Sequence, residues 1–115
     1  MVDTSDCLFC KIVDGEVPAD VVVRTDRVLA FRDISPQAPT HVLVISLDHH
    51  PDIGALAEAD SETLADLVTV GRRIAADETS GDFRLVFNSG ARANQSVFHV
   101  HGHVLAGRDM TWPPG

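Results

Sequence analysis

The chain has 115 residues, of which 44% are hydrophobic, and its formal net charge at pH 7 is −8. This length and the absence of repeats or low-complexity tracts predict a single domain over residues 1–115. The negative net charge argues against general electrostatic binding of nucleic acid, because neutralising phosphates requires clustered Lys and Arg. No apolar run approaches a membrane span, and the polar start Met1–Asp6 does not match a secretory signal, so we expect a cytoplasmic protein with no membrane partner.

The first motif is a pair of closely spaced cysteines, Cys7 and Cys10, in a C-x-x-C pattern. In a reducing cytosol such a pair indicates a metal or redox site before it indicates a disulfide. A thioredoxin-like redox pair is disfavoured, because no strand pattern precedes the cysteines. A tetrahedral zinc site needs two further ligands, for which His49 and His99 are the candidates. A pair of unligated, partly buried thiols is the alternative.

The next stretch predicts a β-hairpin and a proline-containing loop. Residues 21–25 and 28–32 are β-branched and apolar runs separated by Asp26-Arg27, which predicts two strands and a turn. Two prolines exclude regular structure over residues 33–39. At the start of this loop, Asp33 has two equally supported roles, which are to accept hydrogen bonds from a ribose diol or to bind the backbone of the turn.

The middle of the chain predicts a buried strand and then one main helix. The nearly continuous apolar run of residues 40–46 is typical of a central strand, within which we interpret His41 as structural. Of the pair that follows it, His49 and His50, only one can point into a given site, and His49 is chosen. Asp60 is the expected N-cap of the helix. The predicted apolar stripe of this helix is Leu64, Leu67, Val68, Gly71, Ile74 and Ala75. Gly71 suggests the close approach of another backbone, such as that of a partner subunit.

Three histidines alternate with small or apolar residues after a further predicted strand over residues 83–88. On a strand, His99, His101 and His103 share one face, and Val100, Gly102 and Val104 share the other. A largely neutral imidazole serves as nucleophile, hydrogen-bond partner or metal ligand, so the row predicts either phosphate chemistry or a bare metal site. The loop of residues 89–96 has small side chains and Arg92, which suits an anion; a plain solvated loop is the alternative.

Taken together, these motifs resemble the histidine triad (HIT) superfamily, and within it the histidine triad nucleotide-binding (HINT) branch of the bacterial zinc-bearing type. The matching segments are Asp6 to Ile12, Leu29 to His41, Asn88, Gln95 to Leu105 and Trp112-Pro113-Pro114-Gly115. Two positions depart from the usual pattern: Gly102 stands where an apolar residue is usual, which should cost packing, and the loop of residues 91–94 lacks the usual glycines. The resemblance implies an α+β fold, with a five-stranded antiparallel sheet, one main helix and a short N-terminal helix, dimerising into a continuous sheet.

The resemblance also implies an activity, which is hydrolysis of purine nucleoside 5′-phosphoramidates, such as adenosine phosphoramidate or lysyl-adenylate types, through a covalent nucleotidyl-histidine. The implied catalytic residues are His101 as nucleophile, with His103, Ser96 and His99. The implied nucleotide-binding residues are Leu8, Phe9, Ile12, Phe31, Asp33, Ile34, Asn88, Gln95, Ser96, His101 and His103. One structural zinc ion per chain would be held by Cys7, Cys10, His49 and His99.

Two alternative functions stay open. One is a dinucleoside polyphosphate hydrolase of the Fhit type, which the Trp-Pro-Pro-Gly tail disfavours. The other is a nucleotide-binding regulatory module without turnover, because a fold is inherited independently of its chemistry. The expected partners are purine nucleoside monophosphates, their phosphoramidates and a second copy of the chain.

Overall fold

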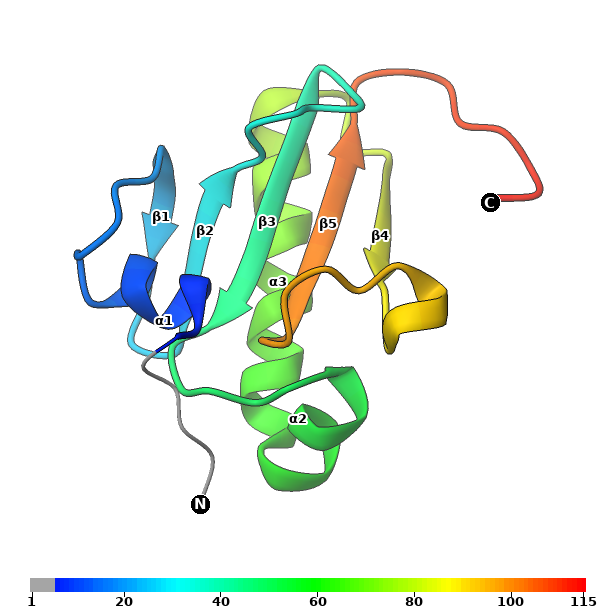
Figure 1. Ribbon diagram of the computed structural model, residues 1–115. Coiled ribbons are helices and arrows are strands. Elements are labelled where there is room, and N and C mark those ends of the chain that lie inside the picture. The colour runs from blue at the N-terminus through cyan, green and yellow to red at the C-terminus, as the bar shows by residue number, and fades with distance from the viewer. Residues whose placement is uncertain (1–5) are drawn as a thin grey trace.

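A five-stranded antiparallel sheet in the order β1-β2-β3-β5-β4 forms the centre of the computed structural model, which describes residues 6–115 (Figure 1). The strands are β1 (Val21–Arg24), β2 (Val28–Arg32), β3 (Thr40–Ser46), β4 (Phe83–Phe87) and β5 (His101–Ala106). The helices are α1 (Leu8–Val13), α2 (Ile53–Ala59), α3 (Ser61–Glu78) and a short 3-10 turn, η1 (Ala91–Ala93). This arrangement confirms the predicted sheet, main helix and short N-terminal helix.

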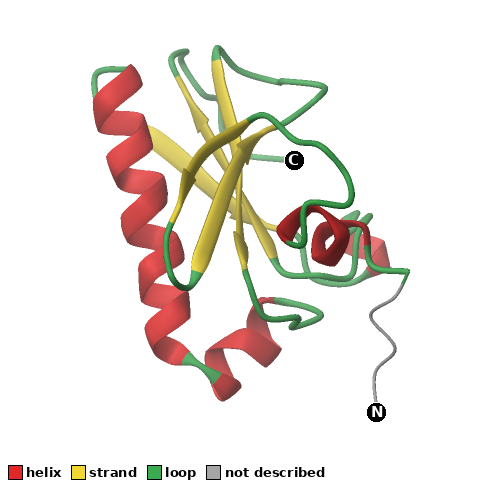
Figure 2. Cartoon of the chain, turned by 90° about the vertical axis from the view of Figure 1, so that its left-hand side faces the viewer, coloured by secondary structure: helices red, strands yellow, loops and turns green. Residues whose placement is uncertain are grey.

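Helices cover both faces of the sheet (Figures 1 and 2). The long helix α3 packs on one face, where Val42, Val44 and Val104 are fully buried with Leu67 of the helix. The opposite face carries α1, and there Phe9 packs with Phe31 and Ile45. Because both faces are covered, every residue of the central strand β3 is buried, as its apolar run predicted.

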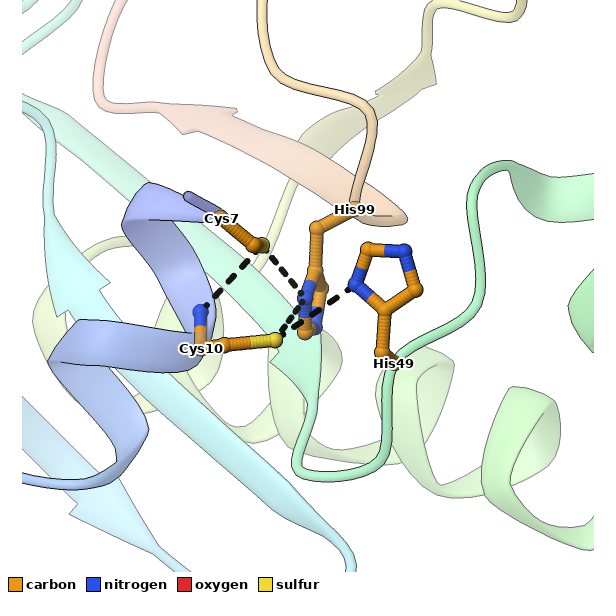
Figure 3. A group of neighbouring side chains, drawn as sticks. All are labelled: Cys7, Cys10, His49 and His99. Carbon is orange, nitrogen blue, oxygen red and sulfur yellow. Dashed lines mark hydrogen bonds between the residues drawn. The ribbon is translucent and has the colours of Figure 1, made fainter. Parts of the chain in front are cut away.

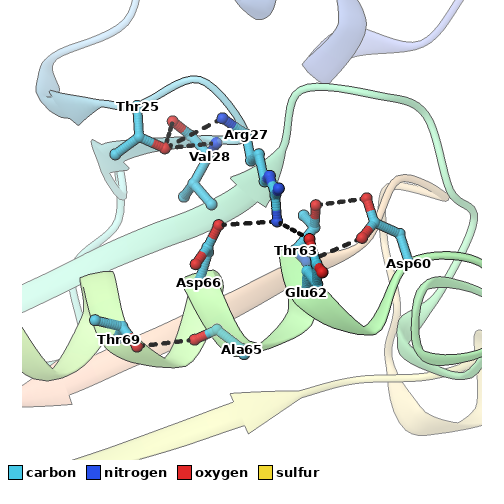
Figure 4. A network of polar contacts seen from close by, with 9 residues as sticks. All are labelled: Thr25, Arg27, Val28, Asp60, Glu62, Thr63, Ala65, Asp66 and Thr69. Atoms are coloured by element: carbon cyan, nitrogen blue, oxygen red, sulfur yellow. Dashed lines mark hydrogen bonds and ion pairs between the residues drawn. The ribbon is translucent and has the colours of Figure 1, made fainter.

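Hydrogen bonds at two predicted boundaries explain why the chain turns where it does. At the β1–β2 turn, the Thr25 hydroxyl oxygen accepts the backbone N–H of Val28 at 3.0 Å. At the start of α3, the Asp60 carboxylate accepts the N–H of Thr63 at 3.1 Å, which is the expected N-cap. Arg27 of the turn forms an ion pair with Glu62 of α3 at 2.8 Å, so the hairpin and the helix are joined at this end (Figure 4).

The helix stripe differs from the prediction in two ways. Val68 is exposed, whereas Val70 is buried. A Cβ atom on Gly71 would lie 2.9 Å from Val104 Cγ2 of β5, so the close approach is to a side chain of this chain, and the expectation of a neighbouring backbone was wrong. Helix α2, which Asp52 caps at its N-terminus, was not predicted.

The strand that carries the histidines is also shorter than predicted. It begins at His101, so His99 lies in the preceding loop, and the interpretation of all three histidines as residues of one strand is corrected. His99 nevertheless faces the α1 side, since its ring centroid is 6.0 Å from that of Phe9. Val100 and Val104 pack on the α3 side, as the alternation predicted.

Every helix within residues 6–115 is too short or too polar to traverse a bilayer. Residues 1–5, on which part of the expectation about a secretory signal rests, lie outside the described residues.

Candidate active site and metal cluster

The two cysteines lie at the start of helix α1, and their sulfur atoms lie on the same side of the helix. Cys7 is the N-cap residue, and its Sγ accepts the backbone N–H of Cys10 at 3.3 Å. Burial, together with the neighbouring Cys7, raises the pKa of the Cys10 thiol to about 12. A redox-active pair needs a lowered thiol pKa, so this environment argues against the redox interpretation.

The two predicted histidines complete a four-residue cluster with these sulfurs (Figure 3). His99 Nδ1 lies 3.4 Å from Cys7 Sγ and 3.5 Å from Cys10 Sγ, and His49 Nδ1 lies 3.4 Å from Cys10 Sγ. Around a tetrahedral zinc ion with ordinary bond lengths, sulfur and nitrogen ligands lie about 3.6 Å apart. All four ligating atoms are within 4.8 Å of one another, so the donor set fits zinc without rearrangement.

A hydrogen bond behind the cluster orients one of its ligands. His99 is fully buried, and its Nε2–H donates to the carbonyl oxygen of Ser46 at 2.7 Å. Because a carbonyl oxygen only accepts, the proton is on Nε2 and the lone pair of Nδ1 faces the sulfurs. Four protein ligands close the coordination shell, which is the arrangement of a structural rather than a catalytic zinc site.

The next residue along this side of the sheet, His101, is held in one tautomer. Its Nδ1–H donates to the carbonyl oxygen of His99 at 2.9 Å, which leaves the lone pair on Nε2. The residue is buried, and burial lowers the pKa of its imidazole, so the ring is neutral near pH 7. The Phe9 and His101 rings are in edge-to-face contact at a centroid distance of 5.0 Å. His101 therefore has a neutral, oriented imidazole with its lone pair on Nε2.

A chain of three hydrogen-bonding groups fixes the tautomer of His103. The backbone N–H of Gln37 donates to His41 Nδ1 at 2.9 Å, so the proton of His41 is on Nε2. His41 Nε2–H donates to His103 Nδ1 at 2.9 Å, and the proton of His103 is therefore on Nε2. Burial lowers the pKa of His103 to about 4, so this ring is also neutral.

Asp33 lies beside these two rings. One carboxylate oxygen, Oδ2, is 3.5 Å from His41 Nε2 and 4.0 Å from His103 Nδ1. The ligating atoms of Asp33, His41 and His103 are close enough for a metal ion. However, His41 Nδ1 accepts the Gln37 N–H, so the proton of His41 is on Nε2. A metal bound at Nε2 would displace this proton to Nδ1 and break the hydrogen bond from Gln37. The geometry therefore favours the chain of hydrogen bonds over a metal site.

A largely apolar cavity of about 440 Å³ is lined by Phe9, which packs against His101, and by Asp33, which lies beside His103. It brings together many of the residues predicted to bind a nucleotide: Leu8, Phe9, Ile12, Phe31, Asp33, Ile34 and Ser96. Its size falls in the range of cavities that hold small ligands, about 300–1,000 Å³. A larger cavity of about 600 Å³ lies between Pro39, Glu78 and Asp109, but none of the residues predicted to bind a nucleotide lines it.

Comparison with known proteins decides the family. A family model described as "Scavenger mRNA decapping enzyme C-term binding" matches residues 6–112. The 14 kDa zinc-binding protein of Zea mays is 44% identical over 116 residues, which cover 98% of this chain and 91% of that protein. The chain belongs to the HIT-like family. Its fold agrees, because the crystal structure of a HIT family hydrolase from Legionella pneumophila matches with a TM-score of 0.91 and 48% identity, covering 96% of this chain and 100% of that one. A Zn-bound histidine triad family protein from Mycobacterium smegmatis matches with a TM-score of 0.79 and 36% identity, covering 93% and 78% of the two chains.

Four of the residues predicted to bind a nucleotide do not line this cavity of the HIT-like chain: His101 and His103, whose contacts are described above, and Gln95 and Asn88. The Gln95 side chain is buried and bonds the backbone at three places: Oε1 accepts Gly90 N–H at 2.8 Å, and Nε2–H donates to Pro51 O at 2.6 Å and Val97 O at 3.1 Å. This arrangement holds the loop that carries Ser96 next to the cavity. Asn88 lines a separate hollow together with the C-terminal Trp112.

His41 is the member of this HIT-like site that the sequence did not predict. It was interpreted as structural, and the structure places its imidazole against His103, 62 positions away along the chain. The only sequence signal was a histidine inside an otherwise apolar strand. Such a residue needs a buried polar partner, and that requirement could have prompted a search for one.

Proposed function

We propose that this protein hydrolyses purine nucleoside 5′-phosphoramidates through a covalent nucleotidyl-histidine formed on His101. The observation that carries the proposal is the hydrogen bond from His101 Nδ1–H to the His99 carbonyl oxygen, at 2.9 Å. It leaves a neutral lone pair on Nε2 of a ring that packs against Phe9 of the apolar cavity, and a neutral lone pair is what a nitrogen nucleophile requires.

The chemistry follows from these tautomers. The Nε2 lone pair of His101 attacks the α-phosphorus, the bond from phosphorus to the amine nitrogen breaks, and the departing amine takes up a proton from solvent. Water then attacks the nucleotidyl-histidine, which releases the nucleoside monophosphate, returns a proton to solvent and restores the neutral imidazole. The proton on His103 Nε2 and the hydroxyl of Ser96 serve as donors to the phosphate oxygens and the leaving group. Because the hydrogen bond from His41 orients His103 before substrate binds, little reorganisation of this donor accompanies the reaction.

The nucleoside is assigned to the apolar cavity. Phe9, Phe31 and Leu43 supply flat and aliphatic surface for a purine base. Asp33 combines the two roles expected for it, since its Oδ1 accepts the Ser35 N–H at 2.7 Å and its Oδ2 is left for the ribose hydroxyls. Gln95 and Asn88 contribute by shaping the neighbouring loop and rim rather than by lining the base cavity.

One structural zinc ion per chain is assigned to Cys7, Cys10, His49 and His99. The support is the donor geometry of this chain, together with the zinc named for its relatives from Zea mays and Mycobacterium smegmatis. Zinc contributes about 10–16 kcal/mol of apparent binding free energy in small zinc-finger peptides. We expect one zinc per chain by elemental analysis. Metal-free protein with reduced cysteines, whose melting temperature does not respond to added zinc, would exclude the assignment.

We further propose that the protein acts in the cytoplasm as a homodimer. Trp112 supports the dimer, because it is 82% exposed in the isolated chain and an aromatic side chain with that exposure is costly unless a partner covers it.

The test of the proposed activity is to trap the intermediate. Adenosine phosphoramidate with a label on phosphorus is mixed with the protein, the reaction is quenched in alkaline detergent, and the labelled peptide is located by mass spectrometry. We expect the label on His101. His101→Ala should abolish labelling and turnover while nucleoside monophosphate binding stays within a few fold. His50→Ala is the matched control, because its side chain lies on a different cavity and should leave both unchanged.

The same assay separates the alternatives. Faster cleavage of a dinucleoside polyphosphate than of the phosphoramidate would favour the Fhit-type reaction. Nucleotide binding without label or turnover would favour a regulatory module. Wild-type turnover by His101→Ala would exclude the proposed nucleophile.

A further inference from the structure

Helix α1 is shared by the metal cluster and the proposed reaction site. Cys7 and Cys10, at its first turn, supply the two sulfur ligands. Between them, Phe9 is 5% exposed, and its ring is in edge-to-face contact with His101 at a centroid distance of 5.0 Å and with Phe31 at 5.5 Å. The position of the Phe9 ring therefore depends on how α1 is held.

Apolar packing of Phe9, Ile12 and Val13 holds the helix on the sheet, and the cluster holds its first turn. The helix contains six residues, which is far below the length at which an isolated helix is stable in water. A side-chain contact at its other end comes from Arg24, whose guanidinium donates to the Val13 carbonyl oxygen at 3.0 Å in an exposed position. A metal ion bound by Cys7 and Cys10 would fix the first turn to two distant segments of the chain.

His99 forms a second connection between the two sites. Its side chain belongs to the cluster, and its backbone carbonyl oxygen is the acceptor for His101 Nδ1–H at 2.9 Å. His99 lies before β5, outside the regular strand, so the sheet ladder does not fix this carbonyl. The neighbouring Val100 N–H donates to the His50 carbonyl oxygen at 2.8 Å, which ties the loop to the segment that carries the fourth ligand, His49.

We propose that the Cys7–Cys10–His49–His99 cluster, when it holds its metal, positions the His101 imidazole for attack. The proposal rests on the function proposed above. His99 is a positioning residue that keeps the proton of His101 on Nδ1, and Phe9 is a positioning residue that restricts rotation of the ring. The metal takes no part in the bond-making step, and its removal acts on catalysis through these two contacts. Because α1 also carries Leu8 and Ile12 of the base cavity, metal loss weakens nucleotide binding as well.

The test uses the tautomer of His101 as a readout that needs no substrate. Protein labelled with ¹⁵N in histidine is studied by long-range ¹H–¹⁵N NMR at a fixed pH near 7.5. In zinc-loaded protein, His101 should show a single form with the proton on Nδ1. Removal of zinc with a chelator should give a mixture of tautomers or an exchange-broadened signal. Adding zinc back should restore the single form.

Two variants and a control keep the effect of the metal apart from general loss of stability. Cys7→Ser with Cys10→Ser should lose the metal, lower the melting temperature, mix the His101 tautomers irrespective of added zinc, and reduce kcat at least tenfold while retaining measurable turnover. His49→Ala removes one ligand without changing α1 or His99, so its His101 signal should depend on zinc concentration. Leu67→Ala, at a fully buried position of α3, should lower the melting temperature and leave the His101 tautomer and its response to zinc unchanged.

The outcomes separate this proposal from the proposed function. A His101 signal that stays in the single Nδ1–H form in folded, zinc-free protein would overturn the positioning role, whatever the activity. If the cysteine variant does not fold, His49→Ala and chelator-treated wild type decide the question. A His101 tautomer that follows zinc, in a protein without phosphoramidate turnover, would support the positioning role and exclude the proposed activity. Unaltered kcat in zinc-free protein with mixed tautomers would also overturn the proposal.

Discussion

Replacing His41 tests whether the tautomer of His103 matters for catalysis. His41 is 6% exposed, and its Nε2–H is the protein donor to His103 Nδ1 at 2.9 Å. In His41→Ala this donor is lost, and the His103 ring can rotate or move its proton to Nδ1. Either change takes the Nε2–H away from the phosphate and leaving group.

The size of the effect follows from the hydrogen bond that is removed. Leaving a buried polar group without its partner costs about 1–3 kcal/mol, and each 1.36 kcal/mol corresponds to a tenfold change in rate. We therefore expect kcat for adenosine phosphoramidate to fall about 5- to 150-fold in His41→Ala. The variant should affect kcat more than KM, because none of the residues that line the base cavity is changed.

His41→Gln is the matched control. The amide nitrogen of Gln lies about where imidazole Nε2 lies and can donate to His103 Nδ1, but it cannot accept the Gln37 N–H in the same way. It should recover most of the kcat that His41→Ala loses. Steady-state kinetics on the two variants, with melting temperatures measured alongside, checks this. Equal kcat in Ala, Gln and wild-type proteins would refute the role of the hydrogen bond, and equal losses in Ala and Gln would show that packing accounts for the effect.

Two further predictions concern the C-terminal tail and the response to pH. Deleting Thr111 to Gly115 should change the ranking of leaving groups more than the rate on the simplest phosphoramidate. The reason is that Trp112, which is exposed in the single chain, would pack near the partner subunit in the proposed dimer and shape the rim of the leaving-group pocket. An unchanged ranking would count against this prediction. Burial lowers the pKa of His103 to about 4 in the folded protein, whereas an unfolded chain titrates at about 6.5. The unfolded state therefore binds the proton first, and the free energy of unfolding should fall as pH drops from about 6.5 towards 4. Urea denaturation across this range should show a shallower fall for His103→Gln, and identical slopes would contradict the buried neutral state.

The features that the sequence predicted correctly depend on short-range signals. The β1–β2 hairpin, the Asp60 cap and the buried strand β3 each follow from residues within a few positions of one another. The cluster was predictable for another reason, since two nearby cysteines leave a zinc site incomplete, and few histidines could complete it. Short-range signals failed to locate the start of β5, because His99 fits the alternation of the strand although it lies in the preceding loop.

Contacts that depend on strand register could not be predicted from the sequence. His41 pairs with Leu105 across β3 and β5, and Leu43 pairs with His103, so the two histidines are diagonal neighbours on one face. A shift of register by one residue would place them on opposite faces. The sequence contains both histidines but does not state the register, and His41 was therefore interpreted as structural.

Gly102 shows how the register also alters the meaning of a departure from the family pattern. A glycine at this position was expected to cost packing, yet it pairs with Phe87 of β4, and a Cβ atom there would lie 2.8 Å from Phe87 Cζ and 3.0 Å from Leu85 Cδ1. The Phe87 ring occupies the space that a side chain at position 102 would fill. Because Gly102 lies between His101 and His103, this ring packs the α3 side of β5 behind both proposed catalytic residues. Gly102 and Phe87 therefore complement each other in packing. The Phe87 ring fills the space left by the missing side chain, so the strand stays well packed behind the two histidines.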